Sequence, residues 1–258
     1  MTSVTGRVHL ALHGQVAQVI LSHPGKFNAM SRKMWRELKA VFLELQGRTD
    51  VRCVIVAGEG GHFCAGGDIA EYPDFRFDEA ALRGFHEDEV WGGLGAMLAC
   101  DLPLLAQIEG NCMGAGVEIA SCCDIRVAGQ GARFGAPIAK LGFPMAPREA
   151  ELVAREVGLA TARQMLLEAA VLDAPTMLAR GFLQTVLHDA EVPAEALQRA
   201  ERMTRLAPLA ARLNKQALRA LAGGQGAEAL LPTAYDYADS PEHREGIAAF
   251  LAKRPPHF

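Results

Sequence analysis

The chain has 258 residues, 50% of them hydrophobic, and a net charge of -4 at neutral pH. This is enough for one large domain, or for a domain with an appendage. The mild acidity gives no electrostatic basis for binding nucleic acid or an anionic membrane surface, so we expect neither partner. The N-terminus lacks the pattern of a signal peptide, and no apolar run approaches the ~20 residues of a membrane helix, so a cytoplasmic location is expected.

The first half of the chain alternates predicted strands and helices. Residues 8–12 and 16–21 flank His13 as the strands of a hairpin. Ser31 is expected to cap an amphipathic helix over residues 31–46. Three further apolar runs are typical of buried strands: 53–58, 102–110 and 123–129. This order of strands, glycine-rich loops and helices predicts an α/β fold.

After about Pro144 the strand signals fade and the composition becomes helical. Helical composition marks the segments 149–158, 161–170, 176–187, 193–207 and 240–254. Pro193 suits a first helical turn, and Ser240 with a following proline is a typical helix start. We therefore expect an α/β core over residues 1–192 and a helical oligomerisation region over residues 193–258.

The cysteines predict neither a metal site nor disulfides. They show no C-x-x-C pair and no metal-ligand spacing with histidine, and most stand in apolar runs where cysteine acts as a small hydrophobe. They are Cys53, Cys64, Cys100, Cys112, Cys122 and Cys123.

Two glycine-rich stretches share one arrangement of residues. "VRCVIVAGEGGHFCAGGDI" (51–69) and "LPLLAQIEGNCMGAGVEI" (102–119) each run from a predicted strand through a glycine loop to a predicted helix start. Helix starts expose unpaired N–H groups, so two of them side by side could direct two donors at one developing oxyanion. Glycine loops after strands are also common without such a role, and both interpretations stay open at this point.

Glu118 is the one charged side chain between Cys112 and Ala120. An unpaired carboxylate in an apolar site is costly, which indicates either compensation elsewhere or a function. Nucleotide binding by the glycine loops is not supported, because neither loop matches a phosphate-binding G-x-x-x-x-G-K-[ST] or a dinucleotide-binding G-x-G-x-x-G pattern. The chain also lacks the G-x-S-x-G pattern of a serine hydrolase.

Four segments carry a recognisable pattern in order along nearly the whole chain. They are "HPGKFNAMS" (23–31), "FCAGGDI" (63–69), "GNCMGAGVEIASCCDI" (110–125) and "SPEHREGIAAFLAKRPPHF" (240–258). Together they resemble the signature segments of the enoyl-CoA hydratase/isomerase, or crotonase, superfamily. The resemblance implies a spiral of ββα units with a C-terminal helical trimerisation region. It also implies an acyl-CoA substrate, no cofactor beyond the coenzyme A of that thioester, and a homotrimer or a dimer of trimers.

The resemblance also implies three catalytic positions. The backbone N–H groups of Gly67 and Ala115 would form the oxyanion hole; alanine replaces a glycine common in the family, but it keeps the N–H. Glu118 matches the first of two glutamates in the family's hydratases and would move protons next to the stabilised enolate. An apolar pocket would raise its pKa, and the helix start would oppose part of that rise. The alternative role for Glu118 is interaction with the helix dipole alone.

The second glutamate of the family pattern is missing. Ile138 stands at its position and cannot transfer a proton. Glu149 or Glu151 could reach the pocket from the next segment, but we expect both to be solvated. The sequence therefore predicts a single catalytic glutamate.

The expected contacts with coenzyme A depart from the family pattern as well. A lysine that often follows the "FCAGGDI" motif is replaced by Ala70, which leaves Lys26 and Lys253 as candidates. Phe250 could pack on the coenzyme of a neighbouring subunit, and Asp68 could cap a helix instead of touching substrate. For both lysines a solvated side chain is the open alternative. The residues expected to contact coenzyme A are Lys26, Cys64, Ala65, Gly67, Asp68, Ile69, Ala70, Phe250 and Lys253.

Three functions remain open at the level of the sequence. The first is an enoyl-CoA hydratase or isomerase that acts through Glu118. The second is other enolate chemistry, such as decarboxylation of a malonyl-type thioester or thioester hydrolysis. The third is a catalytically weak subunit that binds acyl-CoA without full acid/base equipment.

Overall fold

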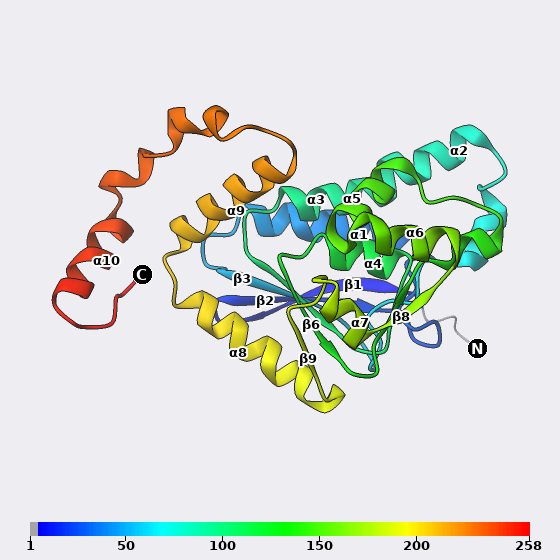
Figure 1. The fold of residues 1–258 in the computed structure, drawn as a ribbon, viewed down its shortest axis with the longest axis horizontal. Helices are drawn as coiled ribbons and strands as arrows, with labels where there is room; N and C mark the ends of the chain where they lie inside the picture. Colours follow the sequence, from blue (N-terminus) through cyan, green and yellow to red (C-terminus); the bar gives the residue numbers. More distant parts are fainter. Residues whose placement is uncertain (1–4) are drawn as a thin grey trace.

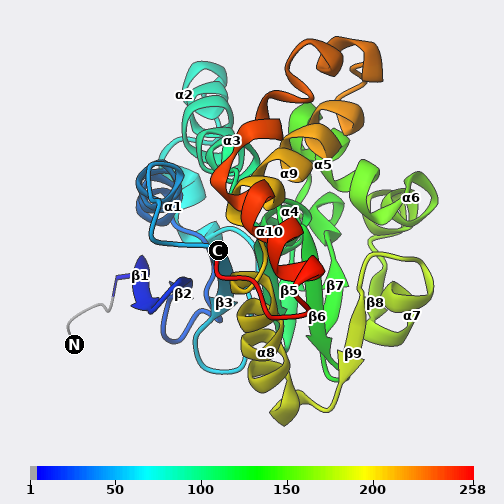
Figure 2. The same cartoon turned by 90° about the vertical axis from the view of Figure 1, so that its left-hand side faces the viewer.

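The computed structural model describes residues 5–258, shown from two sides in Figures 1 and 2. Its strands are β1 (Arg7–His13), β2 (Val16–Ser22), β3 (Cys53–Gly58), β4 (Leu104–Ile108), β5 (Asn111–Met113), β6 (Ile125–Gly129), β7 (Arg133–Gly135), β8 (Val171–Asp173) and β9 (Thr185–Leu187). Its α-helices are α1 (Arg32–Gln46), α2 (Glu79–Gly84), α3 (Trp91–Ala99), α4 (Ala115–Ser121), α5 (Pro147–Val157), α6 (Leu159–Leu167), α7 (Ala174–Ala179), α8 (Val192–Thr204), α9 (Pro208–Ala222) and α10 (Pro241–Leu251).

The larger sheet has the strand order β1-β2-β3-β4-β6-β9. β1 and β2 form the antiparallel hairpin predicted around His13, and the other neighbours are parallel. Side chains alternate between two buried faces: Val54 and Leu104 belong to one core cluster, Ile55 and Leu105 to another. A sheet covered on both faces needs apolar residues at successive positions, which explains the unbroken apolar runs of β3 and β4.

Helices cover both faces of this sheet (Figure 1). On one face lies α1, whose N-cap Ser31 accepts a hydrogen bond from Met34 N at 3.2 Å, as predicted. On the other lies α8, whose Val192, Ala196 and Ala200 recur four residues apart and pack with the strands. The predicted division of the chain at residue 192 stays a prediction.

The chain coils as it passes between the two sheets. The smaller sheet has the order β5-β7-β8. β4, β5 and α4 follow one another as one unit, and β6, β7 and then α5 follow as the next. Each unit gives one strand to the larger sheet, one to the smaller sheet and then a helix. This is the spiral of ββα units that the resemblance to the crotonase superfamily implies.

The two glycine loops meet edge to edge beside the smaller sheet. Cys64 N donates to Asn111 O and Met113 N donates to Cys64 O, at 2.8 and 2.9 Å. α4 then approaches the first loop so closely that a Cβ on Gly116 would lie 2.6 Å from Cys64 O. Glycine at this position is therefore a steric requirement of the contact between the loops.

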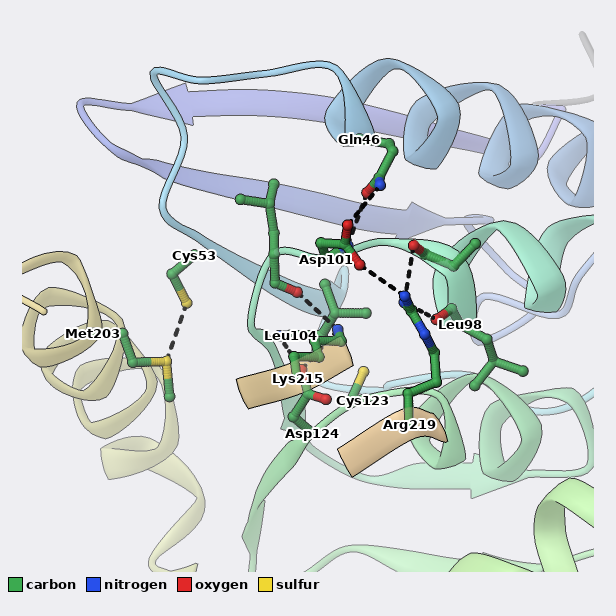
Figure 3. Close-up of polar contacts among 12 residues, drawn as sticks. Gln46, Cys53, Leu98, Asp101, Leu104, Cys123, Asp124, Met203, Lys215 and Arg219 are labelled. Carbon is green, nitrogen blue, oxygen red and sulfur yellow. Dashed lines mark hydrogen bonds and ion pairs between the residues drawn. The ribbon is translucent and has the colours of Figure 1, made fainter. Parts of the chain in front are cut away.

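α9 is held to the core by charged side chains (Figure 3). Lys215 Nζ lies 2.8 Å from a carboxylate oxygen of Asp124. Arg219 donates to Leu98 O and pairs with Asp101, each at 2.9 Å. α10 lies farther from the sheets, at one end of the molecule (Figures 1 and 2).

Several predicted elements are confirmed and others are wrong in their type. The hairpin, the helix from Arg32 and the three buried strands are confirmed, as are Pro193 in the first turn of α8 and Ser240 as the cap of α10. The helix expected over residues 176–187 divides into α7 and β9, and β5 precedes α4. The first glycine loop leads into a 3-10 helix, Ile69–Asp74, rather than an α-helix. The missed strands are three residues long and form through distant partners, so they leave little local signal.

Two kinds of feature are absent from residues 5–258. In this part of the chain, no helix is both long and apolar enough to cross a membrane. The same residues contain no cluster of histidine, cysteine, aspartate or glutamate that could hold a metal ion.

Replacing Gly116 with alanine is expected to destabilise the fold. The new Cβ would push α4 away from Cys64 O, and overpacking of this kind costs about 1–3 kcal/mol in the free energy of unfolding. Gly95→Ala in α3 is the matched control, because its Cβ would meet its nearest neighbour at 3.8 Å, an ordinary contact. Chemical unfolding at one protein concentration would measure both variants. Equal stabilities of Gly116→Ala and the wild type would contradict the steric requirement.

Candidate active site

A cavity of about 200 Å³ lies where the two glycine loops face the segment from Pro137 to Glu149. Most of its wall is apolar, and a few polar groups converge on it, as in small-molecule sites. The polar and ionisable side chains in the wall are Tyr72, Arg76, His86, Glu118 and Glu149. Gly67 and Ala115 contribute backbone to the same wall.

The N–H groups of Gly67 and Ala115 donate no backbone hydrogen bond within residues 5–258. Around Gly67, Met30 pairs with the residues on either side: its N–H donates to Gly66 O, and its O accepts from Asp68 N, both at 2.8 Å. Successive groups of an extended chain point in opposite directions, so the N–H of Gly67 points away from Met30. Ala115 is the first residue of α4, where N–H groups have no partner inside the helix.

Glu118 lies in the first turn of α4 and is buried in the cavity wall. Its N–H donates to Gly114 O at 3.1 Å, so the helix itself fixes its position. Burial raises the pKa of the carboxyl to about 8, and the negative charge of Glu149 adds to the rise. At neutral pH the Glu118 carboxyl is therefore mostly protonated.

Glu149 brings a second carboxyl group to the cavity, so the prediction that it is solvated is wrong. The residue is only 3% exposed, and its Oε1 atom lies 3.1 Å from Nδ1 of His86. In α5 it shares the buried face with Leu152 and Val153, three and four positions later. That spacing was the available sequence signal. Glu151 lies outside this face and is exposed, as predicted.

Ile138 also lines the cavity, at the position where the resemblance implies a glutamate. Its side chain therefore adds apolar surface to the site. The expectation of a single carboxyl group in the pocket fails because the second one comes from α5, a different element of the fold.

His86 was not predicted as a site residue. It belongs to a π-helix, Phe85–Val90, inserted between α2 and α3. Single π-helical turns are rare and often occur at functional sites. His86 reaches Glu149 across 63 residues of sequence, so no local pattern could indicate the pair.

The residues expected to contact coenzyme A take different positions around the cavity. Ala65, Gly67 and Ile69 line it, whereas Cys64 is fully buried and Ala70 is exposed.

Lys26 and Asp68 form an ion pair of 2.6 Å just beside this segment. Asp68 also accepts a hydrogen bond from Ala70 N at 3.3 Å, so its predicted capping role is confirmed for a 3-10 helix.

Phe250 lies in the last turn of α10 and Lys253 two residues after its end, both outside the wall of this cavity. Phe250 is 81% exposed. Within the described chain, therefore, these residues do not join the site, and their predicted contact with coenzyme A would need a neighbouring subunit.

Comparison with known proteins agrees with this geometry. A sequence model described as enoyl-CoA hydratase/isomerase matches residues 12–258. The chain is 32% identical over 249 residues to 2,3-dehydroadipyl-CoA hydratase from Escherichia coli, covering 95% of each protein. It is 29% identical over 256 residues to short-chain-enoyl-CoA hydratase from Clostridium acetobutylicum, covering 96% of this chain and 95% of that protein.

Solved structures of this family also have the same fold as this chain. A crystal structure of an enoyl-CoA hydratase/carnithine racemase from Magnetospirillum magneticum superposes with a TM-score of 0.93 at 34% identity. The match covers 97% of this chain and 94% of that chain. The predicted α/β fold of crotonase-like ββα units is thereby confirmed.

The raised pKa of Glu118 predicts how stability depends on pH. The folded protein keeps a proton at Glu118 that the unfolded chain releases above pH 4.5. The free energy of unfolding should therefore fall as pH rises from 4.5 to about 8, with a contribution of at most about 1.4 kcal/mol per pH unit. Chemical unfolding across this range would show that Glu118→Gln has a flatter profile than the wild type. Glu151→Gln is the control and should keep the wild-type profile; parallel profiles for Glu118→Gln and the wild type would contradict the burial of an ionisable group.

Proposed function

Because the chain belongs to the enoyl-CoA hydratase/isomerase family, we propose that it hydrates an enoyl-CoA in the cavity between its two glycine loops. The observation that carries the proposal is the pair of carboxyl groups, Glu118 and Glu149, in one largely apolar cavity beside two N–H groups that have no backbone partner within residues 5–258. Acid/base chemistry on a thioester needs these elements together.

The thioester oxygen would accept hydrogen bonds from the N–H groups of Gly67 and Ala115. Negative charge develops on this oxygen when a nucleophile adds to the β carbon, and preorganised donors in a dry site stabilise it. Both donors are backbone groups, so they are held by the fold and need no side-chain ordering. Alanine at position 115 supplies its N–H as glycine would.

The two carboxyl groups would divide the proton transfers of hydration. One, as carboxylate, takes a proton from water while the water oxygen bonds to the β carbon. The other gives a proton to the α carbon as the enolate collapses, so that one water molecule is added in total. The raised pKa of Glu118 suits the donor role, and Glu149, next to His86, suits the base.

This assignment favours hydration over the single-base reactions. Isomerisation needs one base that removes and returns a proton, and decarboxylation of a malonyl-type thioester needs chiefly the oxyanion hole. Neither uses a second buried carboxyl group. Thioester hydrolysis and a catalytically weak acyl-CoA-binding subunit remain as outcomes of the test below.

The chain would work as a homotrimer or a dimer of trimers. The support is the apolar surface of its C-terminal region, where several large side chains are exposed on or beside α9 and α10. These are Leu218, Leu221, Leu231, Tyr235, Ile247, Phe250 and Leu251. Large apolar side chains exposed in such number in one region are typical of interaction surfaces. In such an assembly Phe250 and Lys253 of one subunit could reach the coenzyme bound by another.

Turnover in deuterated water tests the hydratase proposal. With crotonyl-CoA, mass spectrometry should detect addition of heavy water by the wild type and a loss of roughly 10²- to 10⁴-fold in rate for Glu118→Gln and for Glu149→Gln. The rate should decline as pH rises through about 8, because Glu118 then loses its proton. Glu151→Gln, on the exposed side of α5, should keep wild-type rates. Full activity of Glu149→Gln would restore the single-glutamate mechanism, and an unchanged thioester would leave a binding subunit or another thioester reaction.

Sedimentation tests the assembly. The wild type should sediment as a species of about three or six times 27.6 kDa at micromolar concentration. Phe250→Glu places a charge in the proposed interface and should shift the protein toward smaller species. A wild-type monomer would contradict the assembly.

A further inference from the structure

Arg76 lines the candidate active site and forms no ion pair with any residue from 5 to 258. Arg76 is half-buried, and its guanidinium lies over the ring of Phe143, 3.7 Å from the ring centroid, and over the ring of Tyr72 at 4.5 Å. Its Nη1 atom is buried and has no hydrogen-bond partner within residues 5–258. Buried polar atoms of this kind are nearly always paired, so this one needs an explanation.

The cavity holds two carboxyl groups, yet neither forms an ion pair with Arg76. Glu149 pairs with His86 instead, and the other carboxyl, on Glu118, is mostly protonated at neutral pH. Contact with aromatic rings compensates a cation only in part, because a ring attracts the charge more weakly than a carboxylate at hydrogen-bond distance does. Among the described residues, therefore, no carboxylate pairs with the guanidinium of Arg76, and the charge of Glu149 is directed to His86.

The arginine lies at a fixed place relative to the proposed thioester position. The hydroxyl of Tyr72 lies against the α carbon of Gly67, so closely that a Cβ there would collide with it. The guanidinium stacks on the same tyrosine ring. The side chain of Tyr72 therefore contacts both Arg76 and Gly67, which is part of the proposed oxyanion hole.

A second cavity adjoins the first at Arg76. It has a volume of about 460 Å³ and shares Tyr72, Arg76, His86 and Phe143 with the first. Apart from Arg76 and His86 its wall is mainly apolar. An acyl chain that passes from one cavity to the other would therefore run past the guanidinium.

From this placement we infer that the acyl group of the substrate carries an anionic end, a carboxylate, which Arg76 binds. The substrate class is a monothioester of a dicarboxylic acid with coenzyme A. This inference rests on the proposed function for the position of the thioester. An arginine guanidinium binds a carboxylate through charge-assisted hydrogen bonds, and the aromatic rings around Arg76 keep water away from the pair.

The phosphates of coenzyme A are the competing source of negative charge. They fit this place poorly, because the rings of Tyr72 and Phe143 lie against the guanidinium and the walls of both cavities are mainly apolar. Several phosphate charges need several donors, and no lysine lines either cavity within the described residues. A terminal carboxylate matches a single arginine.

Binding of saturated thioesters tests the inference without any turnover. Calorimetry would compare adipyl-CoA with hexanoyl-CoA, which differ at the far end of the chain, and would include free coenzyme A. The wild type should prefer adipyl-CoA, and Arg76→Gln should lose about 10- to 100-fold in affinity for it while hexanoyl-CoA changes less than about 3-fold. Arg76→Lys keeps the charge and should lose less than Arg76→Gln. Arg83→Gln removes a charge from the exposed side of α2 and should bind all three ligands as the wild type does.

The possible failures of this test differ from one another. Equal wild-type affinity for both thioesters, or equal losses of both in Arg76→Gln, would overturn the inference and leave the proposed hydratase function intact. An equal loss of free coenzyme A in that variant would assign Arg76 to the phosphates, which also overturns it. Retained binding of hexanoyl-CoA shows that the variant is folded. Binding of no thioester by the wild type would reject the proposed function together with the inference.

Discussion

The backbone pairing between the two glycine loops sets the geometry on which the rest of the site depends. Cys64 exchanges hydrogen bonds with Asn111 and Met113, and this pairing places the extended chain at Gly67 beside the first turn of α4. The contact requires a residue without a Cβ at position 116. The N–H groups of Gly67 and Ala115 and the buried carboxyl group of Glu118 are all positioned by this one backbone arrangement. Changes in the contact would therefore affect the site and the stability of the fold together.

Burial raises the pKa of the Glu118 carboxyl group and, above the ordinary pKa of a glutamate, lowers the free energy of unfolding. A carboxyl group in an apolar wall keeps its proton, and the nearby charge of Glu149 strengthens that preference. Glu149 differs in having His86 as a partner at 3.1 Å. Two chemically identical side chains thus acquire different surroundings, the usual basis for separate acid and base roles.

The sequence predicts the elements that depend on local patterns and misses those that depend on distant contacts. Periodicity found the helix from Arg32 and the strand from Cys53, because each has an apolar pattern and a clear boundary signal. The motif around Glu118 singles out one carboxyl group, and that group lines the cavity. No local pattern predicts His86 as a site residue, because it lies in a π-helix and its contact with Glu149 joins residues 63 positions apart. The charge of Glu149 favours a solvated position, but its spacing from Leu152 puts both residues on the buried face of α5.

The isoleucine at position 138 becomes intelligible once Glu149 is in the cavity. A glutamate at 138 would be a third carboxyl group in a site of about 200 Å³ where two already interact. Like charges at short range raise each other's pKa and cost stability, so one of the three would have to remain protonated without a defined role. An apolar residue removes that conflict and keeps the wall dry around the remaining pair. With the second carboxyl group supplied by Glu149 of α5, the apolar side chain of Ile138 limits the cavity to two carboxyl groups and avoids the repulsion of a third.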